Sequence, residues 1–244
     1  QLNQAQQLIG AEALLRWSHP GRGFISPLYF IRAAEESGLI HPLGDWIIRK
    51  VCEELKHWQQ SGLPASFERV AINISPRQFI VDDFAHRVCE LVEESGVNPT
   101  WIELEITESM LMSNLDSNIA KMQYLKGKGF YLSIDDFGTG YSCLSYLKSL
   151  PISKLKIDQS FTRDLSADRN DRSIVQTIIL MAQTMELDVL AEGVETREQF
   201  EFLSQHGCHK YQGYYFGKPV TASEFMQKWV RPASVPLPIE STQT

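Results

Sequence analysis

Six acidic side chains lie on or just after stretches that read as β-strands, in a chain whose strands and helices alternate. Carboxylate oxygens are the ligands that Mg²⁺ and Mn²⁺ prefer. An unpaired buried charge costs several kcal/mol, so carboxylates that converge need cations to balance them. The pattern therefore predicts a metal site. Its candidates are Glu12, Glu105, Asp135, Asp136, Glu192 and Glu195, with the amide residue Asn73 at the end of another strand.

The phase of the predicted strands places these polar side chains on one face. Successive side chains of a strand point to opposite faces. The two isoleucines that flank Asn73 therefore share one face, and Asn73 lies on the other. Glu103 and Glu105 likewise lie opposite the apolar residues of their strand, and residues 154–158 repeat this pattern with two lysines. We expect the apolar residues to face the helices and the polar ones to face a barrel interior and its C-terminal mouth.

The elements that position these residues alternate between strand and helix patterns. The predicted strands are Ala11–Trp17, Val70–Ser75, Trp101–Thr107, Phe130–Phe137, Lys154–Asp158, Asp188–Val194 and His209–Phe216. The predicted helices are 26–38, 42–60, 82–95, 171–185 and one that begins at Thr196. Glycines follow several of these helices, and Thr196 with Gln199 forms a capping-box pattern at the start of the last.

This order predicts parallel strands joined by crossover helices. At 244 residues, a single (β/α) barrel is favoured over an open doubly wound sheet, and no Gly-x-Gly-x-x-Gly follows a strand. A closed barrel needs eight strands and seven are visible, so we expect the first strand to be missing, truncated or within the glutamine-rich start. The barrel is expected over residues 1–230, with residues 231–244 as a loose tail.

Composition excludes several classes of function. The chain has a net charge of −7, which argues against binding to DNA or RNA polymers but not against a small anion carried on metal ions. No apolar run approaches the roughly 18 residues that span a bilayer, and no signal-peptide pattern opens the chain, so we expect no membrane contact and a cytoplasmic location. The four cysteines form no CxxC pair and are expected to be reduced thiols, not zinc ligands.

A series of short motifs lies at the ends of the predicted strands. Glu12–Leu14 is followed directly by Leu15–Trp17, and the later motifs are Asn73–Ser75, Glu105–Glu108, Asp135–Gly140, Lys156–Asp158, Glu192–Glu195 and Gln212–Tyr214. Together they resemble, in order, the motifs of the EAL-type cyclic di-GMP phosphodiesterases. A Glu-Ala-Leu triplet alone occurs often by chance, but the ordered series is specific. The resemblance covers residues 10 to about 219.

The resemblance implies a fold and a reaction. The fold is a modified TIM (β/α)8 barrel whose first strand runs against the others, and the reaction is hydrolysis of cyclic di-GMP to linear pGpG with two Mg²⁺ or Mn²⁺ ions. Five carboxylates that face two divalent ions leave a site near neutrality, which a phosphate can approach. By resemblance, one metal is held by Glu12, Asn73, Glu105 and Asp135, and the other by Asp135, Asp136 and Glu192.

The resemblance also implies roles in catalysis and substrate binding. Two metals lower the pKa of a shared water and stabilise the charge that builds on the phosphate in an in-line displacement. By resemblance, Lys156 contacts this water or a phosphate oxygen, and Glu192 is the other candidate for handling the proton, a role that stays open. The guanidinium of an arginine can bind phosphate through two parallel hydrogen bonds. The implied substrate-binding residues are Arg16, Asp158, Glu195 and Gln212.

Residues 136–142 resemble the gating loop of the family, with glycines that permit close approach and movement. Glu108 resembles the glutamate that anchors this loop. The family links the loop to a dimer interface and to sensory domains, so we expect a homodimer and an upstream sensory domain in the parent protein. Two features depart from the family: the upstream Tyr-Gln-Pro motif is absent from this chain, and Cys143 replaces the usual serine.

Two other functions fit parts of the pattern. One is a catalytically inactive receptor that binds cyclic di-GMP; such relatives usually lack a metal ligand, and none is missing here. The other is a barrel enzyme that uses Mg²⁺ to stabilise an enolate, which would not predict the motif at Asp135–Gly140.

Overall fold

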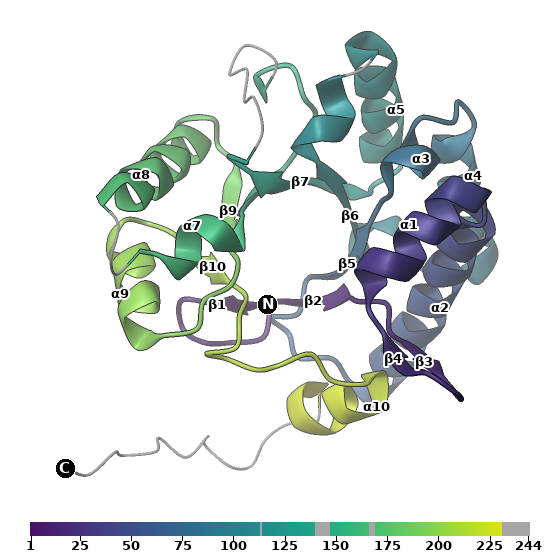
Figure 1. Ribbon diagram of the computed structural model, residues 1–244, viewed down its shortest axis with the longest axis horizontal. Coiled ribbons are helices and arrows are strands. Elements are labelled where there is room, and N and C mark those ends of the chain that lie inside the picture. The colour runs from purple at the N-terminus through teal and green to yellow at the C-terminus, as the bar shows by residue number, and fades with distance from the viewer. Residues whose placement is uncertain (113, 140–146, 166–168, 231–244) are drawn as a thin grey trace.

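The computed structural model describes residues 1–112, 114–139, 147–165 and 169–230, which form a nearly closed barrel surrounded by helices (Figure 1). The strands are β1 Leu2–Asn3, β2 Gly10–Ala13, β3 Trp17–His19, β4 Gly23–Ile25, β5 Arg69–Asn73, β6 Ile102–Thr107, β7 Tyr131–Phe137, β8 Lys154–Ile157, β9 Asp188–Ala191 and β10 Lys210–Tyr211. The helices are α1 Pro27–Ser37, α2 Ile40–Ser61, α3 Pro76–Phe79, α4 Phe84–Ser95, α5 Leu115–Gly127, α7 Gln159–Arg163, α8 Arg169–Thr184, α9 Arg197–Gln205 and α10 Ala222–Phe225, with short 3₁₀ or π turns at Pro99–Trp101 (η1), Glu108–Met112 (η2) and Met226–Val230 (η3).

Eight strands form the barrel sheet in the order β1-β10-β9-β8-β7-β6-β5-β2. All neighbours from β2 round to β10 are parallel, whereas β1 is antiparallel to β10. On its other side β1 adjoins the start of β2: Leu2 forms an antiparallel bridge with Leu8, and the amide of Ile9 donates to the carbonyl of Gln1 at 3.0 Å. The barrel fold is confirmed, and the eighth strand is a two-residue segment in the glutamine-rich start.

Local sequence signals explain most helix ends. Helix α1 has Pro27 in its first turn and ends before Gly38, which takes the left-handed conformation at φ 76° that favours glycine. At the start of α9, Thr196 accepts a hydrogen bond from the amide of Gln199, and the Gln199 side chain returns one, as the capping box predicted. Helix α5 is not among the predicted helices, because its apolar residues do not form a continuous stripe.

Two predicted strands differ most from the structure. The predicted strand Ala11–Trp17 divides, because β2 ends at Ala13 and Trp17 belongs to a separate two-stranded ribbon of β3 and β4. The predicted strand His209–Phe216 is reduced to the two residues of β10. The division at residue 230 remains a prediction, since residues 231–244 lie outside the described part of the chain.

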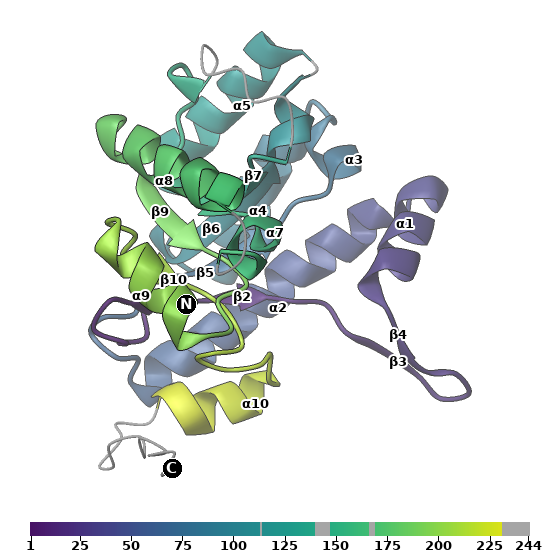
Figure 2. The ribbon, with the colours of Figure 1, turned by 60° about the vertical axis from the view of Figure 1, so that its left-hand side comes forward.

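Strands β3 and β4 and helix α1 form an arm, residues 17–37, that projects away from the barrel (Figure 2). Trp17 packs edge-on against Phe30 inside the arm, with ring centroids 5.7 Å apart. Several apolar side chains of the arm are exposed, among them Phe24 and Leu28. The arm therefore leaves much of its apolar surface uncovered.

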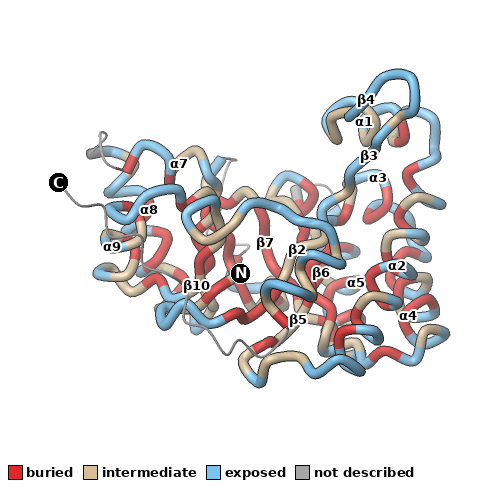
Figure 3. Tube along the Cα trace, turned by 90° about the horizontal axis from the view of Figure 1, so that it is seen from below, coloured by how far each residue is buried: buried red, intermediate tan, exposed pale blue. Residues whose placement is uncertain are grey.

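Buried residues run along the barrel strands, while the arm is mostly exposed (Figure 3). The apolar face of the strands packs against the helices, and the barrel interior is polar, as the strand phase predicted. Glu103 and Lys154 are buried there as an ion pair at 2.6 Å. No helix in the described part of the chain is long and apolar enough to cross a membrane.

Candidate functional site

The polar side chains of the barrel meet where the parallel strands end. The register places Asn73 of β5 beside Glu105 of β6, and Thr107 of β6 beside Asp135 of β7. Glu192 directly follows β9, next to β8. Because parallel strands end at the same rim of a barrel, residues far apart in sequence converge there.

Lys156 of β8 lies at the centre of this cluster. Its side chain is wholly buried, and its Nζ lies 2.7 Å from Glu105 Oε1, 2.6 Å from Glu192 Oε1 and 3.0 Å from Asp135 Oδ1. Glu12 Oε2 is 4.0 Å away. Although burial lowers it, these carboxylates hold the pKa of Lys156 well above its usual value. One ammonium therefore faces four carboxylates.

The carboxylates carry more negative charge than this ammonium neutralises. Burial raises the pKa of Glu105 well above its usual value and that of Glu192 to about 7. Burial and the neighbouring Asp135 raise the pKa of Asp136 to about 6. Each of these raised pKa values reflects a free-energy cost of keeping the carboxylate ionised in this environment. A divalent cation would relieve that cost.

Two observations fit a metal ion here. Asp135, Asp136 and Glu192 each offer an oxygen, and these oxygens lie within 4.8 Å of one another. Glu105 is buried, and its Oε2 has no hydrogen-bond partner among the residues that the structure describes. Hard oxygen donors of this kind suit Mg²⁺ or Mn²⁺.

Two amides hold the carboxylate of Glu12 in place. Asn73 Nδ2 donates to its Oε1, and Gln212 Nε2 donates to its Oε2. Although burial raises it, Lys156 and these two amides hold the pKa of Glu12 below its usual value. The structure therefore brings together Glu12 and Asn73, both predicted as metal ligands, with Gln212, predicted to bind substrate.

Of the other predicted substrate-binding residues, Arg16 and Glu195 are exposed, and Asp158 borders the cluster beside Asp136. Arg16 is exposed, and its guanidinium donates to the carbonyl of Leu15 at 2.8 Å. Glu195 is exposed before α9. Asp158 caps the N-terminus of α7, where it accepts from the amide of Ser160 at 2.9 Å, and it adds to the raised pKa of Asp136.

The predicted loop leaves the barrel at an irregular strand end. Asp136 has φ 53°, a conformation that is costly for a residue with a side chain, and the pairing of β7 with β8 shifts register between Ile134 and Phe137. The amide of Gly138 donates to Glu108 Oε2 at 3.5 Å, a long hydrogen bond between the start of the loop and its predicted anchor. The rest of the predicted loop, 140–142, and Cys143 lie outside the described residues.

Sequence reasoning missed one contact beside the cluster. Ser75, two residues after Asn73, donates a hydrogen bond to Glu35 Oε1 at 2.6 Å. Ser75 could have been found, because Ser75 and Gln78 have the spacing of a capping box. Glu35 carries no such local signal.

Comparison with known proteins places this geometry in a family. The EAL domain profile matches residues 2–219. The bifunctional diguanylate cyclase/cyclic di-GMP phosphodiesterase MucR of Pseudomonas aeruginosa is 40% identical over 219 residues, 90% of this chain and 32% of that protein. The cyclic di-GMP phosphodiesterase NbdA of the same organism is 42% identical over 233 residues, 93% of this chain and 29% of that protein. The chain thus spans about a third of these relatives.

Comparison with solved structures points to the same family. The PaMucR phosphodiesterase in its c-di-GMP complex superposes with a TM-score of 0.88 at 40% identity, over 92% of this chain and 90% of that chain. An EAL domain protein from Listeria monocytogenes gives a TM-score of 0.82 at 28% identity, over 93% of this chain and 89% of that chain. Both cover the barrel that presents the carboxylates.

Proposed function

Because the chain belongs to the EAL domain family, we propose that it is a metal-dependent phosphodiesterase that hydrolyses cyclic di-GMP to linear pGpG. The observation that carries this proposal is the ring of carboxylates around Lys156 at the C-terminal mouth of the barrel. In support of it, the residues of the implied ligand set are present in the sequence and contact one another or Lys156 in this cluster. The similarity to named cyclic di-GMP phosphodiesterases supports the choice of substrate.

We assign the metal ligands to two overlapping groups. Mg²⁺ or Mn²⁺ would be held by Asp135, Asp136 and Glu192, whose oxygens lie close together. A second ion would be held by Asp135 with Glu12, Asn73 and Glu105, whose buried Oε2 lacks a hydrogen-bond partner in the described part of the chain. When bound, the two ions supply an activated water and neutralise charge on the phosphate.

The residues of the chain contribute charge and orientation. Lys156 places a buried ammonium among the carboxylates, where it can stabilise negative charge on a phosphate oxygen or a hydroxide. Glu192 lies 2.6 Å from Lys156 Nζ. By family resemblance, Lys156 and Glu192 are the two candidates for contact with the attacking water.

Four further residues are proposed to bind substrate. Gln212 borders the cluster through Glu12, and Asp158 lies near Asp136, so both can meet a ligand that reaches the carboxylates. Arg16 and Glu195 are exposed, so a ligand can reach their side chains from solvent. Glu108 is proposed to anchor the loop that begins at Asp136.

A homodimer, a cytoplasmic location and an upstream sensory domain stay predictions. The greater length of the relatives supports the upstream domain.

Turnover of cyclic di-GMP by the purified protein with Mg²⁺ or Mn²⁺, analysed by chromatography for pGpG, tests the proposal. The Glu12→Ala variant should lose product formation by at least about a hundredfold, because a ligand and its charge are removed. Glu36→Ala, which changes an exposed glutamate of the arm, is the matched control. Tight binding without product would favour the inactive receptor, and neither binding nor product would overturn the assignment to this substrate.

A further inference from the structure

The hydroxyl of Ser75 has two partners next to the proposed metal site. It accepts a hydrogen bond from the amide of Arg77 at 3.1 Å, which caps helix α3, and it donates its proton to Glu35 Oε1 at 2.6 Å. A hydroxyl has one proton and two lone pairs. Donation to Glu35 fixes the direction of that proton and leaves a lone pair for the helix cap.

Glu35 comes from the arm, not from the barrel. The chain leaves the site after Glu12 in β2, runs out through β3 and β4, and returns along α1 (Figure 2). Glu35 lies near the end of α1, so its bond to Ser75 joins the returning arm to the end of β5. The bond is charge-assisted, which makes it stronger than one between neutral groups.

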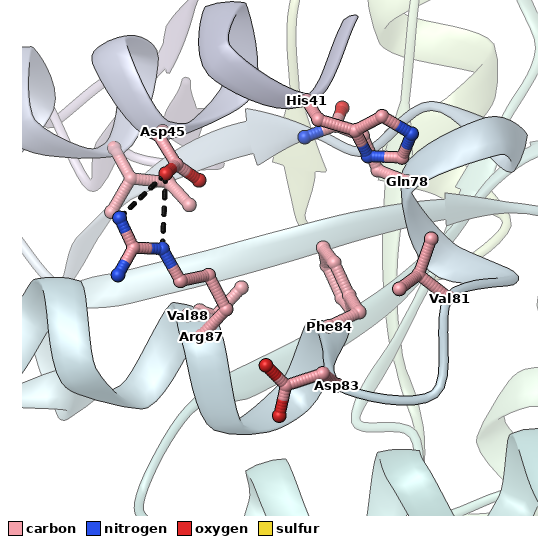
Figure 4. A pocket seen from close by; sticks show the side chains of 9 residues that line it. His41, Asp45, Gln78, Val81, Asp83, Phe84, Arg87 and Val88 are labelled. Atoms are coloured by element: carbon pink, nitrogen blue, oxygen red, sulfur yellow. Dashed lines mark hydrogen bonds and ion pairs between the residues drawn. The ribbon is translucent and has the colours of Figure 1, made fainter. Parts of the chain in front are cut away.

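Helix α3, which follows the end of β5, borders a pocket on one side. A cavity of about 290 Å³ lies between α2 and α4, and Gln78 of α3 is part of its wall (Figure 4). The ion pair of Arg87 and Asp45 also lines this cavity. Helix α3 has four residues, of which Gln78 and Phe79 are buried, so packing and the Ser75 cap together hold it in place.

Two other hydrogen bonds act on the same segment. The amide of Ser75 donates to Gln78 Oε1 at 3.3 Å, and the amide of Ile74 donates to the carbonyl of Glu105 at 3.0 Å. The first closes the turn, and the second ties it to β6. Among the hydrogen bonds of the described residues, the one from Ser75 to Glu35 ties this turn to the arm.

We propose that Glu35 is a positioning residue that orients Asn73 for metal binding. The inference rests on the proposed function, because it concerns the metal that Asn73 would hold. Glu35 fixes Ser75, Ser75 fixes the chain two residues after Asn73, and Asn73 in turn contacts Glu12. The arm thereby sets the geometry of two proposed ligands. These are Glu12 in β2, after which the chain enters the arm, and Asn73 at the end of β5, which Glu35 reaches through Ser75.

Mn²⁺ affinity, measured by calorimetry or by electron paramagnetic resonance on the full chain without substrate, tests this role. Glu35→Ala should weaken Mn²⁺ binding about tenfold, since partners that orient metal ligands commonly contribute 10- to 100-fold in affinity. Glu35→Gln keeps an oxygen that can accept from Ser75 and should stay within about threefold of the wild type by the same reasoning. Glu36→Ala is the control, because Glu36 pairs with Arg32 at 2.9 Å on the exposed side of the same helix.

A double-mutant cycle separates positioning from general destabilisation. In an Asn73→Ala background, Glu35→Ala should change Mn²⁺ affinity by less than about twofold, because the ligand that it orients is gone. Equal affinity of Glu35→Ala and wild type, or a tenfold loss that persists in the Asn73→Ala background, would overturn the inference.

Two further results bear on the positioning role: a Glu35→Ala variant that does not fold, and a wild-type protein that does not bind Mn²⁺. If Glu35→Ala does not fold, Ser75→Ala takes its place with the same expected tenfold loss, since it removes the other partner of the bond. If the wild-type protein itself does not bind Mn²⁺, the proposed function fails, and the positioning role fails with it. Binding by the wild type with unchanged binding by both variants overturns the positioning role alone.

Discussion

At the scale of single residues, the barrel interior holds two buried lysines of β8 in different charge environments. Lys154 has one carboxylate partner, Glu103, at 2.6 Å. Lys156, two residues further along the same face, has carboxylates of Glu105, Asp135 and Glu192 within 3.0 Å. The first is a balanced ion pair, whereas the second is surrounded by excess negative charge.

This difference predicts different responses to substitution. Lys156→Met should lower the free energy of unfolding by about 3–5 kcal/mol in metal-free buffer, because buried carboxylates lose their cation. Added Mn²⁺ should restore part of this loss, since the cations replace the ammonium. Urea unfolding with and without Mn²⁺ measures both quantities.

Lys154→Met is the matched control for this prediction. It should cause a similar loss by leaving Glu103 unpaired, but Mn²⁺ should restore nothing, because Glu103 is not among the proposed ligands. Equal recovery in the two variants would mean that Mn²⁺ binds elsewhere.

At the scale of elements, the turn after β10 is packed directly on the main chain that follows β9. The amide of Val194 donates to the carbonyl of Gln212 at 3.1 Å, and the amide of Gln212 donates to the carbonyl of Ala191 at 2.9 Å. Gly213 lies so close that a Cβ there would come within 3 Å of three main-chain atoms of Val194. The position of Gln212, and through it that of Glu12, depends on this contact.

Gly213→Ala should therefore destabilise the protein by at least about 1–3 kcal/mol, because main-chain atoms cannot move aside as a flexible side chain can. We expect cyclic di-GMP turnover to fall as well, since Gln212 is displaced. Gly127→Ala is the control: a Cβ there meets nothing within 4 Å at the end of α5, so stability should stay the same or rise by up to about 1 kcal/mol. Thermal unfolding compares the two, and equal stability would contradict the close packing of this turn.

At the scale of the whole molecule, a polar network joins non-adjacent strands at the end of the barrel opposite the site. Asp188 at the start of β9 accepts from Lys210 of β10 at 2.8 Å and from Tyr131 of β7 at 2.6 Å. Lys210 also pairs with Glu68 at 3.1 Å, just before β5. Although partial burial raises it, the hydrogen bonds from Lys210 and Tyr131 hold the pKa of Asp188 below its usual value.

This shift predicts a dependence of stability on pH. Because the folded pKa of Asp188 is depressed, its contribution is fully present above the unfolded pKa of about 3.9 and is lost as pH falls through the folded value. Asp188→Asn should thus cost at most about 1 kcal/mol near neutral pH, and the difference from wild type should shrink as pH falls below about 4. Urea midpoints across this range measure it. Asp82→Asn changes a fully exposed carboxylate and should give a curve that follows the wild type.

Sequence patterns were enough to predict the features that depend on local geometry. Strand phase alone placed Glu105 and Lys156 on the interior face, because side chains alternate along a strand whatever surrounds it. Glycine and capping patterns gave the ends of α1 and the start of α9, since these depend on a few neighbouring residues. The family resemblance added the ligand set and the reaction.

Contacts between distant segments depend on tertiary packing, and local sequence patterns did not predict them. The hydrogen bond from Ser75 to Glu35 joins residues 40 positions apart, and nothing local marks it. The division of the predicted strand before Trp17, and the arm that follows, likewise depend on where β2 finds its partner β5. Local patterns fix which way a side chain points, whereas the packing of whole elements fixes what it meets.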